Sequence, residues 1–149
     1  MSTTHANARL EAFCDGVFAI VVTLLVIDIK IPATAPIESA DALWIQLLHL
    51  VPAIVAFVLS FAVILITWVN HHATLKLIDK SSSSFVYANG FLLLTVAFVP
   101  FPTGLWGEYV ATSFAAPAVC LYNAVLAAQG ARPPDSVHGP WRWWLFQGR

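Results

Sequence analysis

The chain has 149 residues, of which 59% are hydrophobic and only 10% charged, and its mean hydropathy is +0.78. A soluble domain is about 45–50% apolar and about 25% charged, so this composition excludes a water-soluble globular protein and indicates a membrane protein. The net charge of −1 and the lack of a basic block argue against nucleic acid as a partner.

The first apolar segment is predicted to be a transmembrane helix over residues 13–31. Arg9, Glu11 and Asp15 lie before its continuous apolar run, Val17 to Ile27, and the helix stops at Pro32. A secretory signal peptide has a basic start and a small-residue cleavage site, and this segment has neither. We therefore expect the helix to be retained.

Three further segments are apolar and close to the roughly 20 residues that cross a bilayer. The second, residues 43–69, contains Pro52 and closes in the polar stretch WVNHHATLKLIDK. The third, residues 85–101, is expected to end at PFPTG, because two prolines one residue apart do not continue a helix. The fourth covers residues 109–128. The sequence thus predicts an all-α membrane protein with four transmembrane helices in a domain of residues 1–129.

Residues 130–149 form a tail rich in Pro, Gly and Trp, with the stretch WRWWLF near its end. Trp and Arg suit the headgroup layer, so one reading is a segment at the membrane interface; the other is a disordered end. Basic residues are concentrated in the loop after the second helix and in the tail, which predicts that both termini face the cytoplasm. These residues are Lys76, Lys80, Arg132, Arg142 and Arg149.

One stripe of the first helix differs from the purely apolar far side of that helix. With about 100° per residue, Ile20, Thr23, Leu24 and Ile27 fall in one sector, and Phe13 and Arg9 fall in the same sector nearer the mouth. The stripe mixes a hydroxyl with branched aliphatic side chains. A membrane helix is apolar all round, so the same stripe also fits an ordinary packing face.

Asp15 is a charge at the membrane boundary on the opposite side of the helix from Arg9. It either complements the positive end of the helix dipole or joins a polar network with another helix. The partners available for such a network lie at the end of the second segment: Trp68, Asn70, His71 and His72.

The sequence predicts no metal site, no cofactor and no enzyme. Adjacent histidines on a helix point about 100° apart, so His71 and His72 make a poor chelating pair, and no further Cys or His lies at metal-binding spacing. Cys14 and Cys120 are expected to be small buried hydrophobic residues. Hydrolase and phosphate-loop motifs are missing.

Three motifs in order resemble the transmembrane protein 175 family of potassium channels. Arg9-x-x-x-Phe13-Cys14-Asp15 is similar to the family's R-x-x-x-F-S-D signature, and GVFAIVVTLLVIDIKIP follows it. WVNHH comes in the second helix and NGFLLLTVAFVPFPTGLWGEY in the third. The resemblance extends from Arg9 to about Tyr122.

The resemblance implies a potassium-permeable channel subunit in the plasma membrane of a prokaryote, assembled as a homotetramer around a pore lined by the first helix. It places the pore constriction at Ile20, Leu24 and Ile27, with Thr23 beside them. It also implies a network that anchors the pore helix, formed by Arg9, Phe13, Asp15, Trp68, His71 and His72. The expected partners are potassium ions, lipid and further copies of the chain.

The chain departs from the family pattern in two places. Cys14 replaces the signature Ser and is a weaker hydrogen-bond donor, which is expected to loosen the network. The family has six helices, whereas only four apolar segments occur here. Two alternative functions therefore stay open: a proton-coupled small transporter using Asp15 with His71 or His72, and a non-conducting membrane scaffold subunit.

Overall fold

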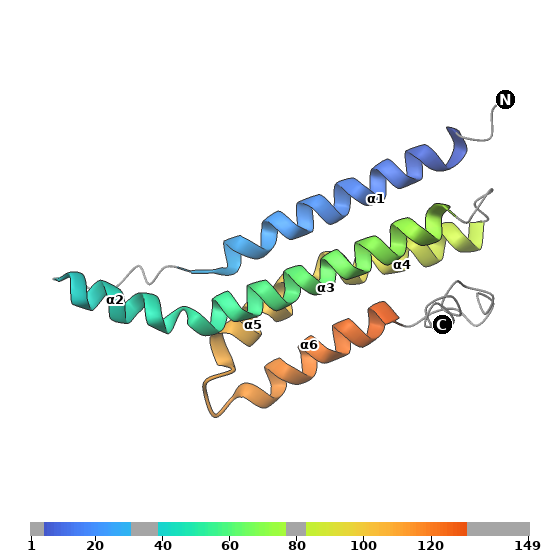
Figure 1. Ribbon diagram of the computed structural model, residues 1–149. Helices are drawn as coiled ribbons and strands as arrows, with labels where there is room; N and C mark the ends of the chain where they lie inside the picture. Colours follow the sequence, from blue (N-terminus) through green and yellow to red (C-terminus); the bar gives the residue numbers. More distant parts are fainter. Residues whose placement is uncertain (1–4, 31–38, 77–82, 131–149) are drawn as a thin grey trace, which may run out of the picture.

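The computed structural model describes residues 5–30, 39–76 and 83–130, which form a bundle of helices (Figure 1). These ranges contain no strand, which confirms the all-α prediction for this part of the chain. The predictions for the tail, including Arg132 and the WRWWLF stretch, lie outside the described residues.

The first helix, α1 (His5–Leu24), continues into a 3-10 turn, η1 (Leu25–Asp28). It begins well before the predicted residue 13, because the preceding stretch RLEA consists of strong helix formers. Its inner face repeats at intervals of three and four residues and is fully packed inside the bundle. The buried residues of that face are Cys14, Phe18, Val21 and Leu25.

The predicted second helix is divided in two, α2 (Ala40–His49) and α3 (Val51–Lys76), with Leu50 between them. Ser39 caps α2, since its side chain accepts a hydrogen bond of 3.1 Å from the Ala42 backbone N–H. Pro52 lies in the first turn of α3, where its missing N–H leaves no intrahelical bond unmade. The polar stretch WVNHH lies in the last turns of α3, as predicted, and the helix continues beyond the predicted residue 69 to Lys76.

The two prolines near residue 100 do not end the third helix. Helix α4 (Ser83–Phe98) is followed after Val99 by α5 (Pro100–Tyr109), and Val99 itself has helical dihedrals (φ −55°, ψ −40°). Pro100 and Pro102 both fall in the first turn of α5, where proline is tolerated. The sequence prediction is wrong here because it treats the prolines as a stop, whereas they begin a new helix.

The fourth predicted helix is shorter than expected: α6 runs from Ala115 to Gly130, 16 residues, and residue 109 belongs to the end of α5. Three helical stretches in the described chain are long and apolar enough to cross a membrane, namely Ala8–Asp28, Val51–Lys76 and Phe85–Tyr109. The structure thus supports an integral membrane protein but does not confirm four spanning helices.

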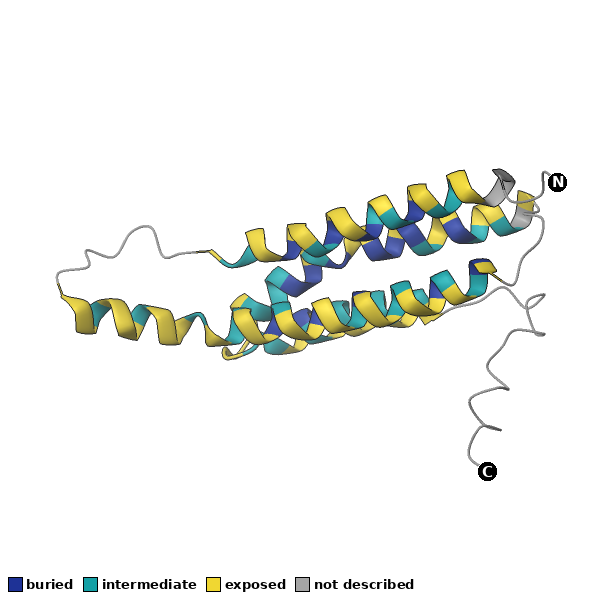
Figure 2. Cartoon of the chain, turned by 45° about the horizontal axis from the view of Figure 1, so that its top comes forward, coloured by how far each residue is buried: buried dark blue, intermediate teal, exposed yellow. Residues whose placement is uncertain are grey.

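Burial is concentrated on the faces that the helices turn toward one another (Figure 2). The central cluster joins the inner face of α1 to Ile64 of α3 and to Leu93, Val96 and Val99 at the end of α4. Helix α2 extends beyond the bundle and has no buried residue. Much of the outward surface is apolar, as expected for a chain whose neighbours are lipid or other membrane helices.

Candidate functional site

The outer face of α1 carries the predicted pore residues. Ile20 is 60% exposed and Ile27 is 69% exposed, while Leu24 and Thr23 are also on the surface. The opposite face of the same helix is packed inside the chain. The helix therefore has one face that the chain covers and one that it leaves for other molecules.

The 3-10 turn η1 aligns the C-terminal part of this stripe. Side chains three residues apart nearly eclipse each other in a 3-10 helix, whereas in an α-helix they differ by about 60°. The change to η1 at Leu25 brings Ile27 into line with Leu24, and both side chains are exposed. The exposed stripe thus continues to Ile27 through the 3-10 turn.

Thr23 is the one hydroxyl among these stripe residues, Ile20, Thr23, Leu24 and Ile27. Its Oγ1 donates to the Ile20 carbonyl over 2.7 Å. Because the proton is used inside the helix, the hydroxyl oxygen presents its remaining lone pairs outward. That arrangement suits a cation rather than an anion.

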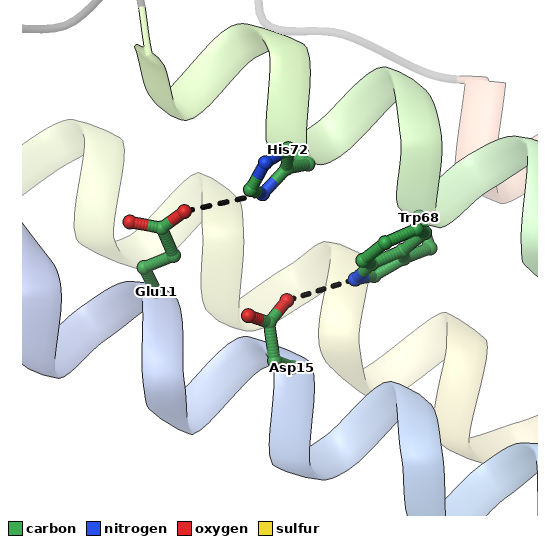
Figure 3. Close-up of polar contacts among 4 residues, drawn as sticks. All are labelled: Glu11, Asp15, Trp68 and His72. Carbon is green, nitrogen blue, oxygen red and sulfur yellow. Dashed lines mark hydrogen bonds and ion pairs between the residues drawn. The ribbon is translucent and has the colours of Figure 1, made fainter.

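A polar network joins α1 to α3 near the N-terminal end of α1 (Figure 3). The indole Nε1 of Trp68 donates to Asp15 Oδ1 over 2.8 Å. One turn earlier on α1, Glu11 Oε1 lies 3.1 Å from His72 Nδ1. The Trp68 and His72 rings are stacked, with centroids 5.6 Å apart and planes at 23°. The structure therefore brings together Asp15, Trp68 and His72 from the predicted set.

His71 occupies different surroundings from its neighbour. Its ring is buried and packs on Phe18, with centroids 5.8 Å apart. Its Nε2 has no hydrogen-bond partner among the described residues. The two histidines face different groups, as the helical spacing predicts.

Arg9 and Phe13 belong to the outer face rather than to this network. Both are exposed, Phe13 to 62%. They continue the stripe of Ile20 toward the start of α1. Of the six residues predicted to anchor the pore helix, these two lie on the side away from α3.

Two contributors were missed by the sequence interpretation. Glu11 is not among the residues predicted to anchor the helix, yet it pairs with His72. Asn89 of α4 is buried and its Nδ2 donates to Cys14 Sγ over 3.0 Å. A lone Asn inside the apolar third segment was the available signal, since buried amides need partners.

The Asn89 contact also corrects the expectation for Cys14. The sulfur acts as an acceptor toward α4 and lies outside the Asp15 and Trp68 pair. Its weakness as a donor is therefore irrelevant to this contact, and the predicted loosening of the network does not follow.

Near the other end of α1, the paired charged side chains are more exposed to solvent than those of the network. Lys30 Nζ lies 3.9 Å from Glu108 Oε2, with both side chains largely exposed. Asp28 packs against Gly104 of α5, where a Cβ would lie 3.5 Å from the Asp28 carboxyl carbon. An exposed pair of this kind stabilises the fold little.

The family model described as "Endosomal/lysosomal potassium channel TMEM175" matches residues 9–100, from Arg9 on α1 to the first residue of α5. The chain belongs to the TMEM175 family. The matched range holds the outer stripe of α1 and every residue of the Glu11, Asp15, Trp68 and His72 network. It confirms the resemblance seen in the sequence, and it is a family of channels rather than of enzymes.

The names of the relatives in this family refer to two different ions, potassium and the proton. A potassium channel of Chamaesiphon minutus is 47% identical over 122 residues, covering 82% of this chain and 60% of the relative. The endosomal/lysosomal proton channel TMEM175 of Mus musculus is 33% identical over 99 residues, covering 63% of this chain and 19% of the relative.

The structure is also similar to a solved TMEM175 homologue. The crystal structure of a lysosomal potassium-selective channel TMEM175 homologue from Chamaesiphon minutus matches with a TM-score of 0.78 at 46% identity. The match covers 83% of this chain and 65% of that one. The chain thus spans about three fifths of the length of the potassium channel relatives that it matches.

Proposed function

We propose that this chain is a subunit of a potassium-permeable channel whose pore is lined by the outer face of α1. The observation that carries the proposal is the exposed stripe of Ile20, Leu24 and Ile27 on a helix whose other face is packed inside the chain. A solved relative with the same fold is named a potassium-selective channel, which supports potassium as the ion.

The stripe acts as an apolar constriction. Rings of branched aliphatic side chains pass ions only when the opening is wide enough to hold water. Thr23 adds an outward hydroxyl oxygen beside the constriction. The Asp15–Trp68 and Glu11–His72 contacts fix the start of the pore helix on α3, so the constriction is held at a defined distance from the axis.

Several copies of α1 around one axis are needed to enclose a pathway, since a single α1 leaves its outer face open. We take the assembly to be a homotetramer in the plasma membrane of a prokaryote, as the family resemblance implies. A detergent-solubilised complex of four chains supports this assembly, and a monomer contradicts it.

Both termini are proposed to face the cytoplasm, with α6 as a fourth crossing. Figure 1 shows the start of α1 and the end of α6 at the same end of the bundle. With 16 residues, α6 is about 24 Å long, a few ångströms short of a typical hydrocarbon core, a mismatch that local thinning accommodates. Three crossings would leave the termini on opposite sides, so labelling each terminus from outside tests this topology.

The test of conduction is a potassium flux assay in liposomes with the parent chain and Ile20→Asn. An amide at the constriction holds water, so the variant is expected to conduct faster. It is also expected to be less selective for potassium over sodium. Ile66→Asn is the matched control, because Ile66 is 61% exposed on α3, outside the stripe. Unchanged conductance and selectivity in Ile20→Asn, in a conducting parent, overturn the pore assignment.

A second candidate is proton conduction, favoured by the name of the mouse relative. It is separated by measuring flux with opposed potassium and proton gradients and a pH-sensitive dye. A potassium channel carries current without a pH gradient, whereas proton conduction changes the internal pH. A proton-coupled transporter, the other alternative, saturates and requires a pH gradient. A scaffold subunit gives no flux by itself, and that result overturns the proposal for this chain.

A further inference from the structure

We propose that Glu11, Asp15 and His72 form a binding site for a divalent transition-metal cation of the Zn²⁺ class between α1 and α3. Each residue offers one ligand atom, and these atoms all lie within 4.8 Å of one another. The donors come from two helices that the network already joins (Figure 3). This inference concerns metal binding and does not depend on conduction.

The distance between the first two donors fits ligands of one metal ion. Glu11 Oε1 and His72 Nδ1 are 3.1 Å apart. Two ligands with bonds of about 2.1 Å at angles of 90–110° lie about 3.0–3.4 Å apart. The Asp15 carboxylate is the third donor, with its ligand atom within 4.8 Å of the other two.

The His72 nitrogen is a second observation that points to a cation. Nδ1 is buried and, despite its short distance to Glu11, it has no hydrogen-bond partner among the described residues. The two atoms are therefore close enough for an ion pair but not aligned for a hydrogen bond. A metal ion between them satisfies both lone pairs.

The charges favour the same conclusion. Glu11 and Asp15 lie one turn apart on α1, and like charges at this spacing are destabilising. A divalent cation offsets that repulsion. One imidazole with two carboxylates is a mixed nitrogen and oxygen donor set, which suits Zn²⁺, Co²⁺ or Ni²⁺ better than Mg²⁺ or Ca²⁺.

The surroundings orient the ligands and leave an entry path. Trp68 donates to one oxygen of Asp15 and stacks on the His72 ring, which fixes both ligands from outside. The Glu11 and His72 side chains remain about one third exposed, 34% and 31%, so the ion and its remaining water ligands can reach them. No metal site is predicted from the sequence because that prediction rests on the spacing of Cys and His residues; the site proposed here combines His72 with two carboxylates.

A bound ion acts as a clamp between α1 and α3. Because it fixes the first turns of α1 to α3, it is expected to raise the thermal stability of the chain. It also restricts any movement of the outer stripe relative to the rest of the bundle.

The experiment uses the full chain in detergent, with ZnCl₂ as the probe, isothermal titration for affinity and thermal unfolding for stability. One Zn²⁺ per chain is expected to bind and raise the Tm. Glu11→Gln and His72→Gln are each expected to weaken binding by at least about tenfold, since they remove a ligand. His49→Gln and Asp41→Asn on α2 are matched controls that leave the affinity unchanged. Equal affinity in parent, Glu11→Gln and His72→Gln overturns the site.

X-ray absorption of the Zn²⁺-loaded parent keeps the test decisive if both variants fail to fold. One imidazole with oxygen ligands is expected. Two imidazoles or a sulfur ligand, or no binding at millimolar Zn²⁺, overturn the proposal.

Discussion

Trp68 Nε1 donates to Asp15 Oδ1 over 2.8 Å, and this bond joins α1 to α3 on the side where the two helices pack. With Asp15 turned to α3, the apolar face of Cys14 and Phe18 is directed into the bundle core. Ile20 is thereby left on the outer side. The Asp15 contact and the packed apolar face thus agree on which side of the helix the chain leaves open.

The first prediction is that Asp15 and Trp68 are energetically coupled. We expect Trp68→Phe to lower the free energy of unfolding by about 1.5–3 kcal/mol, as for a hydrogen bond to a charged group. In an Asp15→Ala background the same change should cost clearly less, with a coupling of at least about 0.5 kcal/mol. Denaturant unfolding of the four proteins in detergent measures the cycle, and strictly additive losses contradict the proposed bond.

The second prediction concerns Cys14 and Asn89. Cys14→Ser keeps an acceptor for the Asn89 amide and should change stability by less than about 1 kcal/mol. Cys14→Ala leaves the buried amide without its partner and should cost about 1–3 kcal/mol. The paired change Cys14→Ala with Asn89→Leu should recover part of that loss, because both polar partners are then absent.

The order of these three variants in thermal unfolding is the readout. Cys14→Ser and Cys14→Ala with equal Tm values mean that the contact contributes nothing. A further loss in the paired variant, relative to Cys14→Ala, means that Asn89 is needed for a contact other than Cys14.

Much of this fold follows from the sequence because apolar length and helix formers are local properties. The helical character of the apolar segments could be read from the sequence, whereas spacing alone left open whether the stripe of Ile20 is an outer face or a packing face. The helix ends could not be read in this way. Whether Pro100 stops a helix or starts one depends on the backbone conformation of the residue before it. Here Val99 has helical dihedrals, so a new helix follows.

The candidate site shows the same limit. Asp15 and Trp68 could be proposed as partners because each is polar at a membrane boundary. Glu11 with His72, and Asn89 with Cys14, depend on which turn of one helix meets which turn of another. That register is set by packing at residues such as Phe18 and Ile64, which carry no polar signal in the sequence.

The third prediction concerns a chain of hydroxyls that fixes α6 to the bundle. Thr103 Oγ1 donates to the Val99 carbonyl over 2.8 Å, so its only proton is used. Ser60, 2.7 Å from Thr103 Oγ1, must then donate to it, and Tyr122, 3.1 Å from Ser60, must donate to Ser60. Ser60 is fully buried at the centre of this chain.

Ser60→Ala should therefore cost more than Tyr122→Phe. The first breaks two bonds and leaves Tyr122 with no acceptor in the triad, for a loss of about 2–3 kcal/mol, whereas the second removes only the terminal donor, at about 0.5–1.5 kcal/mol. Unfolding in detergent compares the two. A larger loss in Tyr122→Phe contradicts the central place of Ser60 in this chain.

The last prediction tests the closest approach of two helices, between Gly107 of α5 and Ala53 of α3. A Cβ at Gly107 would lie 2.8 Å from the Ala53 Cα, closer than side chains approach backbone, so α3 and α5 must separate to admit it. Gly90 of α4 is the matched control, because a Cβ there meets nothing within 4 Å. Alanine is favoured over glycine in a helix by about 1 kcal/mol. Gly90→Ala should thus be neutral or stabilising by up to that amount.

Gly107→Ala gains the same helix preference but loses more through the separation of α3 and α5, and overpacking of this kind costs about 1–3 kcal/mol. The net expectation is a lower Tm for Gly107→Ala and an equal or higher Tm for Gly90→Ala, measured side by side in one detergent. The difference between the two variants isolates the close contact, since both carry the same change in helix propensity. If Gly107→Ala is as stable as Gly90→Ala, the two helices do not pack at this distance.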